Sequence, residues 1–175
     1  MRRLSKPLAA GFTVVELMVT LAVVAILAAM AVPTMRSVIE NSHIRVTSQS
    51  LQNGLSMARA EAVRLNTQVE FVLTGAGWNV QLVDGTLLQQ ASGKELASGT
   101  AATTTPAGSS RITFDAFGRT AANVDASATM TQIDIAATNP SGTAGYKPLR
   151  IQLNTGGLAR LCDPAVASTE PKACL

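Results

Sequence analysis

The spacing of hydrophobic and polar positions divides the chain into three regions. Residues 12–32 are almost continuously apolar, and Glu16 is the only charged residue between Pro7 and Met35. Residues 34–66 carry apolar side chains at intervals of three and four, which predicts an amphipathic helix. The apolar face of this helix is formed by Leu51, Leu55, Ala58, Ala62 and Leu65.

The rest of the predicted helix is less distinctive. Arg59, Glu61 and Arg64 lie off the apolar face and are expected to be solvated. His43 stands alone and is expected at the surface without a special role. Gly54 lies inside the helical pattern, where glycine costs about 1 kcal/mol relative to alanine, and it therefore weakens the helix prediction.

Beyond Asn66 the period of the apolar residues changes to two, which predicts antiparallel strands joined by glycine turns. Residues 89–110 are rich in Ser, Gly, Thr and Ala and are expected to form a long surface loop. A helix followed by strands predicts an α+β domain, in which the amphipathic helix covers one face of a small antiparallel sheet. The strands are expected around residues 69–73, 78–82, 86–88, 112–114, 133–135, 149–153 and 158–162.

The apolar N-terminal run is long enough to cross a membrane. Its 21 residues, Phe12 to Val32, would span about 30 Å as a helix. The basic start, with Arg2, Arg3 and Lys6, should stay in the cytoplasm and leave the C-terminal bulk outside. A secretory signal peptide cleaved at residues 29–31 and a plain membrane anchor both fit this pattern. Neither accounts for a carboxylate within the apolar run, which is costly in lipid and therefore marks a function.

A third interpretation accounts for the carboxylate. The stretch Gly11-Phe12-Thr13-Val14-Val15-Glu16-Leu17 resembles the processing site of type IV pilins and pseudopilins. The resemblance implies that prepilin peptidase cleaves between Gly11 and Phe12 and that the new amine at Phe12 is N-methylated. It assigns Glu16 to an ion pair with a terminal amine during assembly. It also places a helix kink at Pro33, as expected for proline inside a helix.

Three later segments are similar to the GspH/FimT branch of the pilin superfamily: 57–63, 114–119 and 157–162. The resemblance implies a minor pilin or pseudopilin of a type IV pilus or a type II secretion pseudopilus, priming assembly or lying near the tip. The implied partners are other pilins or pseudopilins, prepilin peptidase, the inner-membrane assembly platform and membrane lipid. The implied location is the inner membrane, single pass, with a periplasmic C-terminal domain that can enter a filament.

This interpretation divides the chain into four parts. The first is a cleaved leader, followed by a transmembrane segment that forms the filament core, an amphipathic helix, and a periplasmic β-domain with a C-terminal disulfide loop. Their boundaries are 1–11, 12–33, 34–66 and 67–175.

Charge bears on the rival function, a pilus-associated DNA receptor for natural transformation. The formal net charge is +3, but without the three basic residues of the first six the chain has equal numbers of acids and bases. A neutral body argues against an extended basic surface for DNA. Arg150, Arg160 and Lys172 remain as candidate phosphate contacts. Leu158 stands where DNA-binding relatives carry a second arginine, which weakens that role.

Cysteine and histidine content limits the chemistry of the chain. Cys162 and Cys174 are expected to form a disulfide in an oxidising compartment. One histidine and two cysteines are too few for a structural zinc site, so no metal is expected. The sequence shows no nucleophilic side chain paired with a general base, so neither an enzyme nor a cofactor is expected.

Overall fold

The structure is a computed structural model that describes residues 11–75, 77–91, 99–140 and 145–174, without the side chains of residues 30–34. The predicted leader therefore lies outside the described residues except for Gly11. The chain forms two compact units, Met1–Arg36 and Ser37–Leu175. Helix α1, Val14–Leu65, contributes its first part to one unit and its second part to the other.

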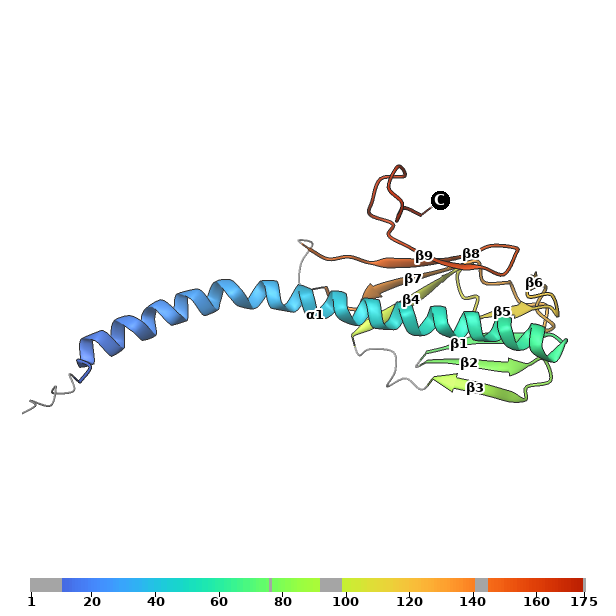
Figure 1. Ribbon diagram of the computed structural model, residues 1–175, viewed down its shortest axis with the longest axis horizontal. Helices are drawn as coiled ribbons and strands as arrows, with labels where there is room; N and C mark the ends of the chain where they lie inside the picture. Colours follow the sequence, from blue (N-terminus) through green and yellow to red (C-terminus); the bar gives the residue numbers. More distant parts are fainter. Residues whose placement is uncertain (1–10, 76, 92–98, 141–144, 175) are drawn as a thin grey trace, which may run out of the picture. The chain divides into compact units, whose positions relative to one another are not determined.

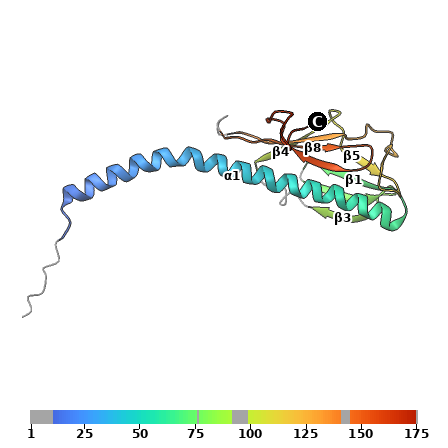
Figure 2. The same cartoon turned by 45° about the horizontal axis from the view of Figure 1, so that its top comes forward.

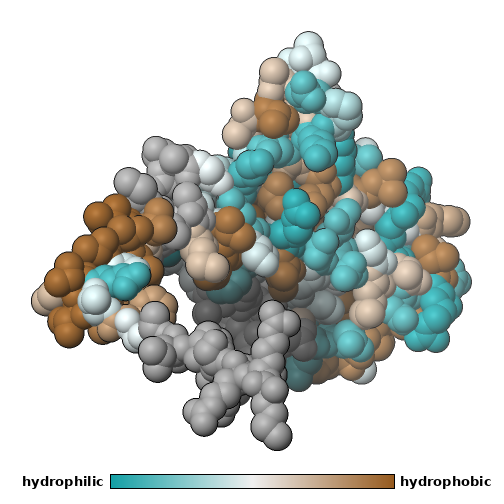
Figure 3. All heavy atoms as spheres, turned by 60° about the vertical axis from the view of Figure 1, so that its left-hand side comes forward, coloured by the Kyte–Doolittle hydropathy of each residue, from teal (hydrophilic) through white to brown (hydrophobic). Residues whose placement is uncertain are grey.

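The first unit is built from the apolar part of α1. The helix is continuous through position 33, so the kink at Pro33 stays a prediction. Large hydrophobic side chains of this part are exposed on all sides of the helix, and its surface is mostly hydrophobic (Figure 3). No helical stretch within the described part of the chain combines the length and the hydropathy of a membrane span.

The second unit contains two antiparallel sheets packed on the second part of α1 (Figures 1 and 2). The first sheet has the strand order β3-β2-β1-β5-β6, and the second has the order β4-β7-β8-β9. The strands are β1 (Val69–Thr74), β2 (Gly77–Leu82), β3 (Leu87–Ala91), β4 (Thr100–Thr105), β5 (Arg111–Phe114), β6 (Thr120–Ala121), β7 (Gln132–Ala137), β8 (Leu149–Leu153) and β9 (Ala159–Cys162).

The core lies between the helix and the sheets and confirms the predicted apolar face. Leu51, Leu55, Ala58 and Ala62 are buried, whereas Leu65 at the helix end is half-buried. The sheets contribute buried side chains from alternate positions, as the period of two predicts. These include Phe71, Val80, Ile112, Phe114, Ile133, Ile135 and Ile151.

Two predictions about the β-region are wrong. The strands form two sheets instead of one small sheet, and residues 89–110 are not a single loop, because they contain the end of β3 and all of β4. The sequence of β4, TAATTT, has only small side chains and shows no clear hydrophobic alternation. Threonine nevertheless favours strands, and β4 pairs along its whole length with β7. Pairing with a distant strand thus decides its structure.

Gly54 is explained by a close approach between the helix and the first sheet. A Cβ at this position would lie 2.8 Å from the rings of Phe71 and Trp78. These two rings stack with their centroids 5.9 Å apart. The aromatic rings thus fill the space that a side chain would occupy. Their packing against Gly54 outweighs the low helix propensity of glycine.

We expect Gly54→Ala to destabilise the second unit by about 1 kcal/mol. Overpacking costs about 1–3 kcal/mol, while alanine recovers about 1 kcal/mol of helix propensity. Urea unfolding of the full chain in detergent micelles, followed by Trp78 fluorescence, measures this loss. Asn53→Ala, at the exposed neighbouring position, is the control and should be neutral or slightly stabilising. A Gly54→Ala protein that is more stable than the wild type would contradict this explanation.

Candidate functional site

The first turn of α1 brings the residues of the proposed processing site into a defined geometry. The helix begins at Val14, and the Glu16 backbone N–H donates to Thr13 Oγ1 at 3.2 Å. The Leu17 N–H donates to the Thr13 carbonyl oxygen at 3.1 Å. Thr13 is therefore the N-cap, a role that the sequence analysis missed. The spacing Thr13-x-x-Glu16 is that of a capping box and could have revealed it.

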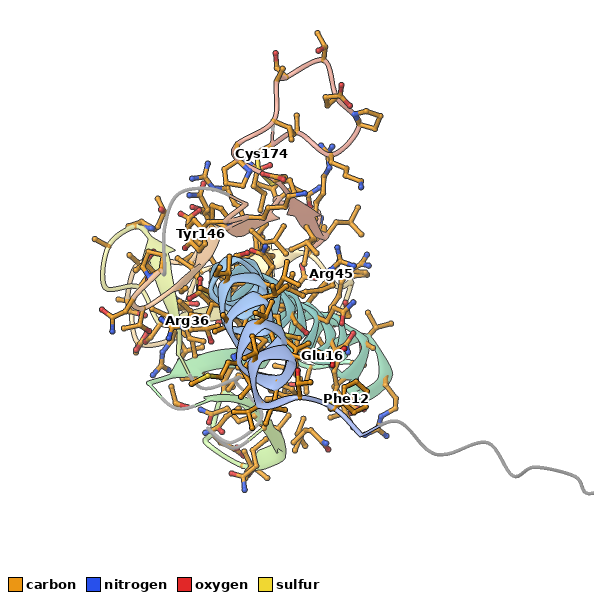
Figure 4. The ribbon with its side chains drawn as sticks, turned by 90° about the vertical axis from the view of Figure 1, so that its left-hand side faces the viewer. Phe12, Glu16, Arg36, Arg45, Tyr146 and Cys174 are labelled. Atoms are coloured by element: carbon orange, nitrogen blue, oxygen red, sulfur yellow. A yellow bond between two sulfur atoms is a disulfide. The ribbon has the colours of Figure 1, made fainter. Side chains whose placement is uncertain are left out.

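This geometry places the processing position at the positive end of the helix. Phe12 is 86% exposed and lies one residue before the N-cap, so the bond between Gly11 and Phe12 is outside the helix. Cleavage there would leave an amine beside the helix N-terminus, where the helix dipole disfavours a cation. Glu16 lies in the first turn, where a carboxylate is favourable, and Figure 4 labels both residues on this end of the chain. A carboxylate here can neutralise an amine of its own chain or of a neighbour.

The helix that follows this turn exposes hydrophobic side chains in all directions. Each large hydrophobic residue from position 12 to position 27 has at least half of its surface open to solvent. A helix that is apolar on all sides is stable in lipid or within an assembly of helices. The exposed set is Phe12, Val14, Val15, Leu17, Met18, Val19, Leu21, Val23, Val24, Ile26 and Leu27.

At the other end of the chain, the predicted disulfide is confirmed. Cys162 at the end of β9 is bonded to Cys174, with their Cα atoms 5.1 Å apart. The Asp163 N–H donates to the Lys172 carbonyl oxygen at 2.8 Å, which adds a short parallel bridge beside the disulfide. The C-terminal segment is thereby fixed to the edge of the second sheet.

Two of the three candidate phosphate contacts are engaged inside the protein. Arg150 Nε donates to Asp134 Oδ1 at 2.6 Å, across the pairing of β7 and β8. Arg160 Nη2 donates to the carbonyl oxygens of Pro171 and Ala173, both at 3.2 Å. Arg160 thus holds the C-terminal segment, while Lys172 lies in that segment with an exposed side chain. These contacts provide no evidence for a phosphate site.

The three segments that carry the GspH/FimT resemblance meet at one corner of the second unit. Arg59 Nε donates to the Gly118 carbonyl oxygen at 2.9 Å, so the expectation that Arg59 is only solvated is wrong. The turn at Gly157 packs directly on Gly118. Asp115 holds its own turn by accepting the backbone N–H of Arg119, that of Phe117, and the Arg119 side chain. These hydrogen bonds hold the pKa of Asp115 below its usual range.

No cluster of three or more His, Cys, Asp or Glu side chains that could bind a metal ion occurs in the part of the chain that the structure describes. The two ends of the described chain differ in character. The N-terminal end offers an apolar helix with one carboxylate, and the C-terminal end is a polar domain stabilised by a disulfide.

Replacing both cysteines, Cys162→Ser and Cys174→Ser, should destabilise the second unit by about 3 kcal/mol, because the bridge restricts the unfolded chain. Urea unfolding of the full chain in micelles tests this. The wild type treated with reductant should lose the same amount, whereas the double variant should not respond to reductant. Equal stability of the oxidised wild type and the double variant would show that the bridge is dispensable.

Two family models match the chain. The model described as "Type II transport protein GspH" matches residues 47–157, and the model described as "Prokaryotic N-terminal methylation motif" matches residues 7–32. Among curated protein sequences, none matches.

Solved structures of similar fold include a minor pilin and a minor pseudopilin. The type IV minor pilin FimU of Pseudomonas aeruginosa is 20% identical with a TM-score of 0.52, over 78% of this chain and 98% of the FimU chain. The minor pseudopilin EpsH from the Type 2 Secretion System of Vibrio cholerae is 13% identical with a TM-score of 0.50, over 71% of this chain and 99% of the EpsH chain. At these identities the likeness establishes the fold.

Proposed function

Because the chain belongs to the GspH family of type II transport proteins, we propose that it is a minor subunit of a type IV pilus or a type II secretion pseudopilus. The observation that carries this proposal is the first part of α1. It is a capped apolar helix that exposes at least half of each large hydrophobic residue from position 12 to position 27 and carries a single carboxylate directly after the processing motif. A helix that exposes hydrophobic side chains in this way gains stability when it packs with other helices.

Before assembly, this helix would be held in the inner membrane in a single pass. The basic residues at positions 2, 3 and 6 would stay in the cytoplasm, and the second unit would lie in the periplasm. The periplasm is an oxidising compartment, which agrees with the disulfide at the C-terminus. The segment 12–33 would enter lipid first and the filament core later, passing from the assembly platform to other subunits.

The position of the subunit would be at the start of assembly or near the tip. FimU and EpsH are named as minor components, and the shared fold supports a minor role here. The proposed role is one of assembly. Arg150 and Arg160 are bonded within the protein and therefore lend no support to the DNA-receptor alternative.

Mass spectrometry of the mature protein tests the processing step. We expect the N-terminal residue to be N-methylated Phe12, with the eleven-residue leader removed. Cells that lack prepilin peptidase should accumulate the uncleaved chain. A mature terminus at Val32 would instead establish a secretory signal peptide and overturn the proposal.

Glu16→Gln should leave the protein in the membrane fraction and reduce its incorporation into filaments about tenfold. The reason is that an unpaired terminal amine is costly in an apolar helix bundle. Immunodetection of sheared filaments against the membrane fraction measures incorporation. Thr13→Val removes the N-cap bond and keeps the carboxylate, so it separates helix capping from the ion pair and should have the smaller effect. Equal incorporation of Glu16→Gln and the wild type would remove the assembly role of Glu16.

A further inference from the structure

A groove of about 590 Å³ lies in the second unit, between α1 and the edge of the second sheet. Its volume is in the range of pockets that hold small ligands or a few residues of a peptide. The helix wall, β8, β9 and the disulfide loop all contribute to its lining. The residues that line the groove include Val38, Arg45, Lys147, Leu161, Asp163 and Lys172.

One wall of the groove is a strand edge with unpaired backbone groups. Within the described part of the chain, strand β9 is the last strand of its sheet, and β8 is the only strand with which it pairs. In an antiparallel pair, every second residue exchanges backbone hydrogen bonds with the partner strand. The bond from the Asn154 N–H to the Leu158 carbonyl oxygen fixes which residues do so: the backbones of Arg160 and Cys162 bond to β8, and the backbone N–H and carbonyl group of Leu161 point away from it. The outward groups on either side of Leu161 are already used. The Ala159 carbonyl oxygen accepts from the Gln52 amide, and the Asp163 N–H donates to Lys172.

Among the described residues, the backbone N–H and carbonyl oxygen of Leu161 therefore point away from β8 without a backbone partner, between two bonded neighbours, and Leu161 lines the groove. An extended chain can exchange both hydrogen bonds with one such residue, as in strand addition. The site is short, because only one residue is available for pairing. It is also protected from extended edge-to-edge association, which needs a row of free groups.

The rim of the groove is cationic. Arg45, Lys147 and Lys172 are all exposed, and within the described ranges none of their side chains forms an ion pair or hydrogen bond. Asp163 is the only acid in the lining, and its Oδ1 accepts the Ala165 N–H. Figure 4, which looks along α1, shows Arg45 at the flank of the helix and Cys174 at the base of the C-terminal loop.

Two of these cations are held in place by the fold. The backbone of Lys147 is fixed to the helix, because its N–H donates to Asn41 Oδ1 at 2.9 Å and the Asn41 amide donates to the Gly145 carbonyl oxygen at 2.6 Å. Lys172 is fixed by the disulfide and by the bridge to Asp163. The fold thus keeps three cations, unpaired among the residues that the structure describes, around a groove whose lining includes the half-buried Leu161.

We infer that this groove binds an extended, acidic peptide segment of a neighbouring filament subunit. One residue of that segment pairs with the backbone of Leu161, and its carboxylates lie against Arg45, Lys147 and Lys172. Charge complementarity and the unpaired strand residue together select this partner over an apolar helix or a nucleic acid, which would leave the Leu161 groups unused. The inference rests on the proposed filament role, since a neighbouring subunit supplies the segment.

The test uses the full chain in detergent micelles and a fluorescein-labelled peptide, acetyl-Thr-Glu-Val-Glu-Val-Glu-Thr-amide, with binding followed by fluorescence anisotropy. We expect saturable binding that weakens as salt rises. The same peptide with its backbone nitrogens methylated should bind at least about tenfold more weakly, because it cannot donate to Leu161. A peptide with Lys in place of Glu should not bind. Hydrogen exchange of the Leu161 amide should slow when the acidic peptide is bound.

The double variant Arg45→Ala with Lys172→Ala should lose about tenfold or more in affinity. Arg64→Ala is the matched control, because Arg64 lies on the same helix outside the groove and should bind the peptide like the wild type. Absence of saturable binding, or equal binding of the N-methylated peptide, would overturn the inference. Displacement of the peptide by an oligonucleotide at equal concentration would overturn it in favour of a nucleic-acid ligand. Each of these failures would leave cleavage at Gly11 and the dependence on Glu16 intact, so the two proposals fail separately.

Discussion

Gly157→Ala will destabilise the second unit by about 3 kcal/mol or more. Gly157 has a φ of +76°, a backbone conformation that an L side chain adopts only at a cost of about 1–2 kcal/mol. A Cβ at this position would also lie only 2.0 Å from the Gly118 carbonyl oxygen, so the two turns must separate. That separation would disturb the corner at which Arg59 Nε donates to the Gly118 carbonyl oxygen, and the added Cβ would lie 3.3 Å from Arg59 Nε.

Urea unfolding of the full chain in micelles, followed by Trp78 fluorescence, measures this loss. Gly156→Ala is the matched control at the adjacent position of the same turn. A Cβ there meets only the side chain of Asn154, with the amide oxygen at 3.3 Å, so the cost should be below about 1 kcal/mol. Equal stabilities of the two variants would show that the corner tolerates a wider turn.

Arg111→Met should destabilise the second unit by about 3 kcal/mol. Arg111 Nη1 lies 3.1 Å from Glu70 Oε2, and the Glu70 side chain is only 2% exposed. Removing the cation leaves a buried carboxylate whose only other side-chain partner among the described residues is the Gln81 amide at 3.5 Å. Methionine keeps the aliphatic stem of arginine, so the loss reports the charge and not the packing.

A double-mutant cycle checks the cause. Glu70→Gln in the Arg111→Met background should recover more than half of the loss, because a neutral amide is cheaper to bury than a carboxylate without a cation. Arg64→Met is the comparison, since Arg64 pairs with Glu61 at the surface and should cost less than about 1 kcal/mol. If the double variant is less stable than Arg111→Met alone, the buried charge is not the source of the loss.

The N-terminal motif could be recognised from the sequence because its signals are local. The apolar run, the isolated Glu16 and the Gly11–Phe12 junction are contiguous, and the match of residues 7–32 to a methylation motif confirms the resemblance found there. The N-cap at Thr13 was equally accessible from the spacing of Thr13 and Glu16. The internal bonds of Arg150 and Arg160 could not be predicted from the sequence, because the groups that accept from them lie elsewhere in the chain. Asp134 lies on another strand from Arg150, and the acceptors of Arg160 lie beyond the disulfide cysteine Cys162.

The sequence by itself determined the helix, its buried face, the strands with apolar alternation and the disulfide pair. Helical and strand periods are properties of the backbone, and they appear in the sequence wherever one face is buried. Only the tertiary structure decided the division into two sheets, strand β4, the glycine contact at the corner and the groove beside β9. Each of these depends on pairing or packing between residues far apart in the chain, and small or polar side chains carry no periodic signal of such contacts.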